Sequence, residues 1–476
     1  MKIIILPMDN RPPNYRFLID LANIYKLDVT LPPKNILGFY RTPGDINLLI
    51  EWLLRQRADL YIISTDMLCY GGLIASRENW TTFEEAEKRL SVLKIIKKLN
   101  PNSNIQLSSI IRRASTSVFS ESSYERWEKM NTYLRIFKTN PEQAKKVEKN
   151  FPRGYIENYW KSRERNHKIN LKCLELVKKG IVDLIVFSVE DTFPGGPHER
   201  EEEALKQKIT EYGIEDKCFI HNGADEALQN LLIRTFNKGT INVIYDSEET
   251  KVKIMDYEDR KLLENVNSHL RLTGFNVSEN AENVVLISGN SKERSLKIIE
   301  KLKKTGKKIY ILDVFKANGS NPDFVNDALA IGGSSIKGYS AWNTASNSLG
   351  TILAEIAEAP NKDKIGLFKF YLERLLDDHL YQGVWREWLE RELMKNGENI
   401  YDVSEKSKTY RRFVDEVFKP CCNKFLEKYF NENICVCKQK SCIFVIHKIE
   451  LKDFKLPWNR TFECELQVEL NGEYKH

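Results

Sequence analysis

The sequence lacks the features that mark a membrane-spanning or exported protein. None of its apolar runs approaches the roughly 20 residues that a transmembrane helix needs. The stretch Met1–Leu6 is too short for the apolar region of a signal peptide and leads directly into Pro7. The net charge is only +6, from 73 basic and 67 acidic residues, and basic pairs such as Lys145-Lys146 lie in helix-like segments. We therefore expect a cytoplasmic protein that binds neither membranes nor nucleic acid.

Several short motifs of known chemistry are also absent. The sequence contains neither a G-x-G-x-x-G nor a G-x-x-x-x-G-K-[ST] fingerprint, so we expect no nucleotide-binding loop of these kinds. A G-x-S-x-G elbow and an H-E-x-x-H motif are missing too, and no cysteine lies in an obvious nucleophile context. Acyl transfer through serine or cysteine is therefore disfavoured. The cysteine pairs near the C-terminus are spaced as CC and CxC, whereas structural zinc sites usually contain CxxC pairs. The sequence therefore indicates no metal, no other cofactor, and a C-terminal region that is dispensable for chemistry.

Apolar runs of strand length alternate with longer amphipathic stretches along most of the 476 residues. This alternation is typical of an α/β fold with mainly parallel β/α units. We favour a (β/α)8-like barrel, because a barrel brings the ends of many strands to one mouth. Two doubly wound Rossmann-like domains that face each other across a cleft are the alternative.

The expected organisation has three parts. Residues 1–360 form an α/β catalytic core, in which the long, charged and strand-free stretch 115–180 is a helical insertion. Residues 361–430 form a helical segment. Residues 431–476 contain alternating apolar and polar positions and form a small β appendage.

Acidic side chains recur where the expected strands end, each before a tight loop and a helix start. They are Asp9, Asp66, Glu190 with Asp191, Asp225 with Glu226, and Asp313. Ligands bind at this edge of the sheet in parallel α/β folds. We therefore predict that these carboxylates line one polar cavity, which favours an enzyme over a scaffold.

The strongest acid/base candidates belong to this set, and they are Asp66, Glu190, Asp191, Asp225 and Glu226. Two carboxyl groups at close range push their pKa values apart, which provides one proton donor and one base or nucleophile. Adjacent residues of an extended strand point to opposite faces, so only one acid of each neighbouring pair can face the cavity directly. The other acid can instead cap the next helix or pair with a lysine.

Polar and aromatic residues near these acids suit a ligand with many hydroxyl groups. The predicted substrate-binding residues are Asp9, Arg11, Asn14, Tyr70, Arg77, Arg112, His198, Asp313, Asn318, Trp342, Asn343 and Asn347. Three structural alternatives stay open. Asp9 and Arg11 can form a salt-bridged turn, Trp342 can be a core residue, and His198 can be a metal ligand.

Five motifs together resemble a known family over at least residues 3–390. They are Leu6–Asn14, Asp66–Arg77, Gly223–Glu226, the stretch from Asp313 to Gly319, and Trp342–Gly350. The combination is similar to a broad prokaryotic family, domain-of-unknown-function family 4127. This resemblance implies no particular chemistry, so the function has to be argued from the residues.

The function we favour is that of a carbohydrate-active hydrolase, a glycoside hydrolase that uses a pair of carboxylates on a small-molecule or oligosaccharide substrate. A divalent-metal-dependent hydrolase, with Asp9, Asp66, Glu190 and His198 as ligands, is one alternative. A non-catalytic sugar- or metabolite-binding protein is another. Turnover separates the enzymes from the binding protein, and sensitivity to a chelator separates the two enzymes.

Overall fold

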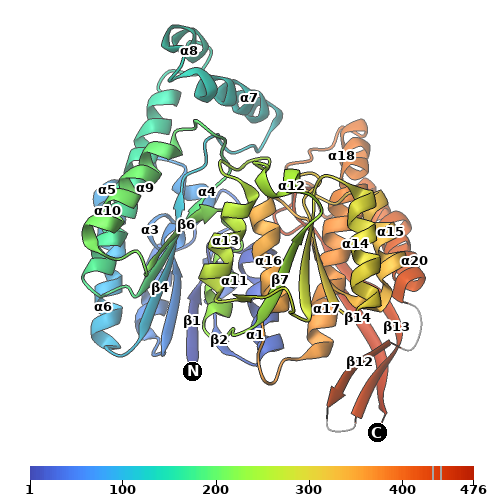
Figure 1. Ribbon diagram of the computed structural model, residues 1–476. Helices are drawn as coiled ribbons and strands as arrows, with labels where there is room; N and C mark the ends of the chain where they lie inside the picture. The colour runs from blue at the N-terminus through green and yellow to red at the C-terminus, as the bar shows by residue number, and fades with distance from the viewer. Residues whose placement is uncertain (431–433, 440–441, 476) are drawn as a thin grey trace.

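The computed structural model describes residues 1–430, 434–439 and 442–475, and for residues 434–439 and 442 it describes the backbone alone. The strands of these ranges form three sheets (Figure 1). The first is parallel, in the order β2 (Asp28–Thr30), β1 (Lys2–Leu6), β3 (Leu60–Ser64), β4 (Asn104–Ile111), β5 (Leu184–Val189) and β6 (Cys218–Asn222). The second is also parallel, in the order β11 (Ile336–Ser340), β10 (Lys308–Asp313), β9 (Asn283–Ser288), β7 (Thr240–Tyr245) and β8 (Asn276–Val277). The third is antiparallel, in the order β12 (Ile434–Gln439), β13 (Cys442–Lys455) and β14 (Glu465–Lys475).

The α/β class with parallel β/α units is confirmed, as is a small C-terminal sheet. The parallel strands form one sheet of six strands and another of five. Two separate parallel sheets are what the alternative prediction, two doubly wound Rossmann-like domains, describes. The chain passes from the first sheet to the second through α11 (Ala227–Arg234), which connects the edge strand β6 to β7.

A layer of helices lies between the two parallel sheets (Figure 1). It contains α1 (Arg16–Tyr25), α11, α13 (Leu262–Thr273) and α16 (Ala345–Ile356). One continuous apolar core joins this layer to both sheets, from Ile5 in the first to Ile287 in the second. Every residue of α16 is buried, as expected for a helix that is covered on all sides. This shared core fixes the C-terminal edges of the two sheets relative to each other.

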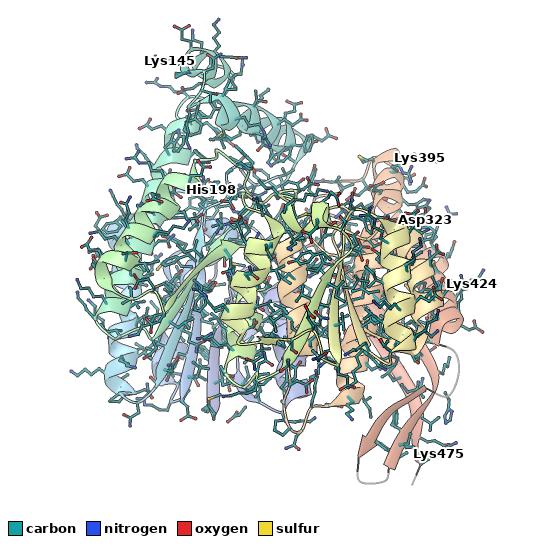
Figure 2. The ribbon with its side chains drawn as sticks, viewed as in Figure 1. Lys145, His198, Asp323, Lys395, Lys424 and Lys475 are labelled. Atoms are coloured by element: carbon teal, nitrogen blue, oxygen red, sulfur yellow. The ribbon has the colours of Figure 1, made fainter. Side chains whose placement is uncertain are left out.

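The outer faces of both sheets are covered as well, which explains why whole strands such as β5 and β9 are buried. The first sheet is covered by α2 (Ile46–Arg55), α3 (Thr65–Tyr70), α5 (Phe83–Leu90), α6 (Val92–Leu99), α9 (Tyr155–Lys178) and α10 (His198–Tyr212), and α4 (Leu73–Ser76) follows α3. The second sheet packs its outer face against another apolar core, which contains side chains of α14 (Lys292–Lys304), α15 (Pro322–Gly332), α17 (Lys364–Arg374), α18 (Arg386–Lys395) and α20 (Lys419–Phe430). Two short helices, α12 (Glu248–Val252) and α19 (Lys408–Arg412), complete the set of α-helices outside the insertion in the described ranges. Lysines such as Lys395 and Lys424 project outward from this body (Figure 2).

Residues 115–180 contain α7 (Glu121–Ile136), α8 (Pro141–Glu148) and α9. Most of the length of the insertion is therefore helical, as expected. The long helix α9 packs its C-terminal half on the first sheet, through Ile169 and Leu174. Its N-terminal half forms a separate small core with α7 and α8, around Met130 and Tyr159. In Figure 1, α7 and α8 extend beyond the edge where the parallel strands end. The insertion thus stands beside the edge at which the predicted site residues lie.

Among the described residues, no helix combines the length and the apolar character needed to cross a membrane. The thiols of Cys421, Cys422 and Cys464 are free. The side chains of Cys435 and Cys437 lie outside the described residues, so the expectation about zinc in this region stays a prediction.

Candidate active site

The centre of the candidate site is a guanidinium shared by two carboxylates. Arg11 Nη2 lies 2.6 Å from Asp9 Oδ2 and 2.6 Å from Asp225 Oδ1. Asn14 Nδ2 donates to the same two carboxylates, at 3.1 Å to Asp9 and 2.8 Å to Asp225. Asp9 follows β1, and the two prolines between Arg11 and Asn14 form a short 3-10 turn that presents both donors on one side. The turn after β1 is therefore bound to the loop after β6.

Burial and mutual repulsion act on this cluster together. Burial raises the pKa of Asp9, the negative charge of Asp225 raises it further, and Arg11 opposes both. Burial alone would lower the pKa of Arg11, but Asp225 and Asp9 outweigh that effect and raise it well above its usual value. The guanidinium is consequently a permanent cation that holds the two acids together.

The loop between β13 and β14 closes one side of the cluster. Trp458 lies under Arg11, whose Cζ is 4.9 Å from the ring centroid. The indole Nε1 donates to Asn10 at 2.6 Å, and Glu463 lies 3.6 Å from Arg11 Nη1. Sequence reasoning treated this region as an appendage and missed these residues. The contacts indicate that the C-terminal hairpin is part of the wall of the site.

The second sheet contributes amides from the start of α16. Asn347 Oδ1 accepts from the backbone N–H groups of Ala224 and Asp225, at 3.2 and 3.1 Å. Asn343 Nδ2 donates to Asp225 at 3.4 Å, and its carbonyl accepts from Asn318 N at 2.8 Å. The structure therefore brings Asn343 and Asn347 to Asp225.

Trp342 is packed more like a core residue. Its ring meets Phe17 edge-on at 6.4 Å, and its Nε1 donates to Thr351 at 3.1 Å. It still borders a cavity of about 30 Å³, together with Arg11 and Asn343. A stacking role for its indole face therefore stays a prediction.

A second cluster follows β5. Glu190 forms a buried ion pair with Arg77 and accepts from the backbone N–H of Arg113 at 3.3 Å. Asp191 lies 2.6 Å from the guanidinium of Arg113. Burial raises the pKa of Asp191, Glu190 raises it further, and Arg113 opposes the shift. The side chain of Asp191 is 22% exposed, which makes it the more accessible acid of this pair.

Asp66 lies in the first turn of α3, directly after β3, and its side chain is buried. It accepts from Ile110 N at 3.1 Å. Burial raises its pKa from 3.8 to about 7, the charge of Glu190 adds to the shift, and Arg77 opposes it. Asp66 therefore keeps its proton at higher pH than an ordinary carboxyl group, close to the second cluster.

Arg77 and Arg112 line a cavity of about 480 Å³ between the core and the insertion. Its other cationic residues are Arg41 and Arg126, and its aromatic residues are Trp80, Phe119, Tyr155 and Tyr159. Arg112 stacks on Tyr159 at 4.3 Å, and its Nη2 donates to the carbonyl of Arg77 at 3.3 Å. Its Nε and Nη1 are buried without a hydrogen-bond partner among the described residues, and burial lowers its pKa to about 10. Unpaired cationic donors beside a cavity are suited to an anionic ligand.

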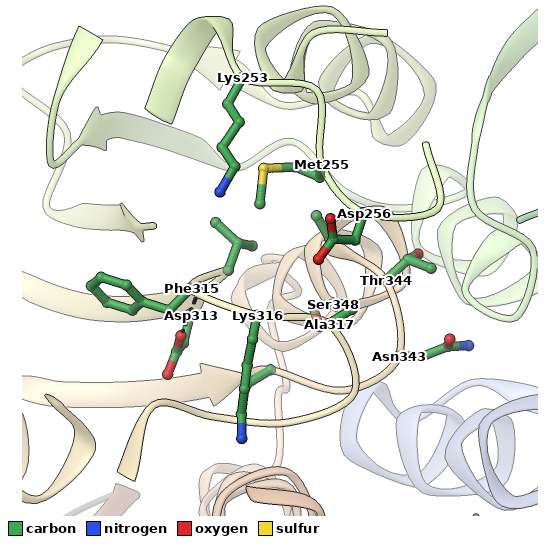
Figure 3. A pocket seen from close by; sticks show the side chains of 13 residues that line it. Lys253, Met255, Asp256, Asp313, Phe315, Lys316, Ala317, Asn343, Thr344 and Ser348 are labelled. Carbon is green, nitrogen blue, oxygen red and sulfur yellow. Dashed lines mark hydrogen bonds between the residues drawn. The ribbon is translucent and has the colours of Figure 1, made fainter. Parts of the chain in front are cut away.

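Asp313 ends β10, at the C-terminal edge of the second sheet. It lies next to a cavity of about 10 Å³ that Lys316 and Asn343 also border (Figure 3). Its carboxylate accepts from Phe315 N at 3.2 Å, Asn321 N at 2.9 Å and Tyr339 Oη at 2.9 Å. Burial raises its pKa to about 6. These bonds shape the loop that carries Asn318, so Asp313 has a clear structural task beside the site.

His198 begins α10, and both of its ring nitrogens are engaged. Its Nε2 lies 2.7 Å from Asp259 Oδ2, and its Nδ1 lies 2.5 Å from Thr192 Oγ1. With Glu202 and Asp259 it forms one of two groups of potential metal ligands in the part of the chain that the structure describes. The other group is His221, Glu226 and His269. Neither contains Asp9, Asp66 or Glu190, so the ligand set expected for a metal hydrolase does not come together.

Tyr70 and Glu226 are not among the residues that line the cavities described above. The hydroxyl of Tyr70 is buried without a partner among the described residues, and Arg165 stacks on its ring at 4.4 Å. Glu226 is fully buried and faces His269 at 3.3 Å. The structure thus gathers most predicted residues into two arginine–carboxylate clusters, with Glu226 behind one of them.

Comparison with known proteins gives one family match. The model of a family described as a protein of unknown function (DUF4127) matches residues 3–467. Searches of curated proteins and of solved structures returned no match.

Proposed function

Because the chain belongs to DUF4127, a family described as proteins of unknown function, its activity has to be inferred from its own site, and we propose that it is a glycoside hydrolase. It uses two carboxyl groups, one as proton donor and one as base or nucleophile. The pair is drawn from the acids that follow the strands of the first sheet.

One observation carries the proposal. Asp66, whose pKa is about 7, lies close enough to Glu190 for that charge to raise its pKa. Glu190 is fixed by Arg77, and Arg77 also lines the 480 Å³ cavity. Environments that separate the protonation of two neighbouring carboxyl groups are what acid/base catalysis of glycosidic cleavage needs. The more exposed Asp191 is the alternative proton donor, because its pKa is also raised.

The cavity favours an acidic sugar over a neutral one. Its size suits a mono- or disaccharide, and rings such as Trp80 and Tyr159 offer faces against which a sugar can pack. The unpaired Nε and Nη1 of Arg112 can each donate to an anionic group. We therefore propose a substrate that carries a carboxylate or phosphate group, such as a uronic acid glycoside.

A substrate panel tests this proposal. The wild-type protein is incubated with 4-nitrophenyl glycosides of neutral hexoses, of N-acetylhexosamines and of uronic acids, and with natural acidic oligosaccharides. We expect release of nitrophenol or reducing ends from the acidic members. Absence of turnover on every member, with a correctly folded protein, contradicts the proposal.

A sugar-binding protein without catalysis is the second candidate. It is favoured by the ion pairs of Asp9, Glu190 and Asp225, which occupy these carboxylates fully. Calorimetric titration with free glucuronate separates the two candidates. Tight binding without hydrolysis of the corresponding glycoside identifies a binding protein.

A further inference from the structure

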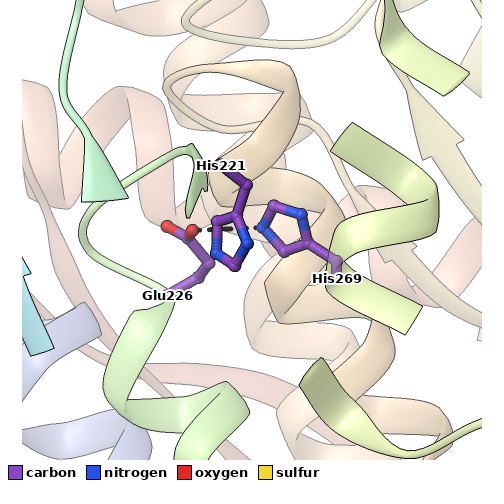
Figure 4. A group of neighbouring side chains, drawn as sticks. All are labelled: His221, Glu226 and His269. Carbon is purple, nitrogen blue, oxygen red and sulfur yellow. Dashed lines mark hydrogen bonds and ion pairs between the residues drawn. The ribbon is translucent and has the colours of Figure 1, made fainter. Parts of the chain in front are cut away.

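Behind the candidate site, three side chains from three different elements converge on one point (Figure 4). His221 is in β6, Glu226 precedes α11, and His269 is in α13. All three are fully buried, and one potential ligand atom from each lies within 4.8 Å of the others. We propose that His221, Glu226 and His269 bind a transition-metal ion, with zinc as the metal of choice. This inference rests on none of the observations that carry the glycosidase proposal.

Hydrogen bonds set the orientation of both imidazoles. His269 Nδ1 lies 2.8 Å from the carbonyl oxygen of Asn265. A carbonyl only accepts, so this nitrogen carries the proton, and the neutral ring has its lone pair on Nε2. His221 Nδ1 likewise lies 3.0 Å from Ser268 Oγ, and its Nε2 is buried without a partner among the described residues. Metal-binding histidines are held in this way, with one nitrogen bonded to an oxygen and the other free for the ion.

The contact between His269 and Glu226 has the spacing of two ligands. Glu226 Oε1 is 3.3 Å from His269 Nε2. Atoms that bind zinc tetrahedrally at about 2.1 Å are roughly 3.4 Å apart. In a neutral His269, this nitrogen and a carboxylate oxygen are both acceptors, so they have no proton to share. A cation between them removes that conflict, and one ring nitrogen of His221 completes the set of three potential ligand atoms that lie within 4.8 Å of one another.

The chain leaves room for the carboxylate of Glu226 by placing glycine on two sides. A Cβ at Gly223 would collide with the Glu226 carboxylate, and a Cβ at Gly350 would collide with its Cγ. Gly223 also has φ +115°, which L side chains rarely adopt. Next to Gly350 lies Asn230, which is fully buried and whose Oδ1 and Nδ2 have no partner within the described ranges. Its unpaired amide oxygen can provide a further ligand for the ion.

The donor set selects the class of metal. Two imidazoles and one carboxylate suit zinc or ferrous iron, whereas magnesium and calcium prefer oxygen ligands. The ion would be a structural one, because its ligands have no exposed surface. Glu226 Oε2 accepts from Ala224 N at 2.9 Å, and Asp225 lies between these residues in the chain. The metal would therefore fix the loop that presents Asp225 to Arg11.

The test measures metal directly. The full chain is purified without chelator and its metals are quantified by mass spectrometry. The stripped protein is then titrated with zinc alone and with cobalt(II) alone. We expect about one zinc per chain, visible cobalt absorption of a site with nitrogen and oxygen ligands, and a rise in Tm with zinc. His269→Gln and Glu226→Gln should lose all three signals.

His198→Gln is the matched control, because it alters the second group of potential metal ligands in the described ranges. It should keep the metal. Zinc that stays with His269→Gln but leaves with His198→Gln overturns the assignment. If the folded wild-type protein binds neither zinc nor cobalt, the proposal is wrong, and His269 and Glu226 form a hydrogen-bonded pair. Where a His269 or Glu226 variant fails to fold, full zinc content in His198→Gln excludes the second group and supports the assignment.

Discussion

Arg11 binds Asp225 across 214 positions of the sequence, through Nη2–Oδ1 and Nη1–Oδ2 contacts of 2.6 and 3.2 Å. The two residues follow β1 and β6, which are separated in the first sheet by three other strands. A bidentate pair of this kind is both strong and geometrically specific. It joins the turn after β1 to the loop after β6.

Replacing Arg11 with methionine should destabilise the protein strongly. Asp9 and Asp225 would stay buried without their cation, and a broken buried pair costs about 3–5 kcal/mol. Urea unfolding gives the free energy of unfolding of the variant and of the wild type. Arg55→Met is the control, because Arg55 pairs with Glu51 at the exposed surface and should matter little. If Arg11→Met and Arg55→Met lowered the free energy of unfolding by the same small amount, the central ion pair would not be important for the fold.

The pH dependence of stability should report on Asp66. Its pKa is about 7 in the folded protein and 3.8 ordinarily. Below pH 3.8 the group is protonated in both states, and above that pH the unfolded chain releases the proton first. Its contribution to stability is thus complete at low pH and is lost as the pH rises to about 7, by about 1.4 kcal/mol per pH unit at most.

Asp66→Asn cannot ionise, so its stability relative to the wild type should increase from pH 4 to pH 7 and then stay constant. Urea unfolding at pH 4, 5.5, 7 and 8 measures this difference. Parallel curves for the two proteins would mean that Asp66 ionises normally in the folded state.

Two stacked arginines offer a matched comparison for the cavity. Arg112 on Tyr159 has unpaired donors, whereas Arg165 on Tyr70 donates to the carbonyls of Ser76 and Thr81 at 2.5 and 2.9 Å. Arg165→Met removes the donor to the carbonyls of Thr81 and Glu78, whereas the carbonyl of Ser76 keeps Asn166 Nδ2 at 2.9 Å. The loss should lower the free energy of unfolding by about 3 kcal/mol. Arg112→Met should cost much less.

Arg112→Met should instead abolish the binding of glucuronate, because it removes the two free donors beside the cavity. Isothermal titration calorimetry measures this loss. A variant that binds glucuronate as the wild type does would exclude Arg112 as the anion-binding residue.

The strands could be predicted from the sequence, since apolar runs such as Leu184–Val189 become buried central strands. The short edge strands β2 and β8, of three and two residues, are too short for a periodic signal. The acids at strand ends were also predictable, because parallel strands end at one edge of the sheet. The position of these acids at one edge of the sheet follows from the parallel strand order alone.

Their partners were not predictable from local pattern. Arg113 reaches Asp191, and Trp458 reaches Arg11, through long-range packing, which leaves no spacing signal in the sequence. His221 and His269 were missed for the same reason, since each is a single histidine within an ordinary strand or helix pattern. Only the fold brings them within ligand distance.

The rates of carboxylate variants test the central claim most directly. Asp66→Asn, Glu190→Gln, Asp191→Asn, Asp225→Asn and Glu226→Gln are assayed on the best substrate of the glycoside panel. Asp183→Asn is the control, because Asp183 precedes β5 at the opposite edge of the sheet and pairs with Lys97. An amide can neither donate the proton nor supply the negative charge, so at least two of the five should lose roughly a hundredfold or more in kcat while folding normally. Five folded variants with the activity of Asp183→Asn would contradict a mechanism that depends on a carboxylate pair.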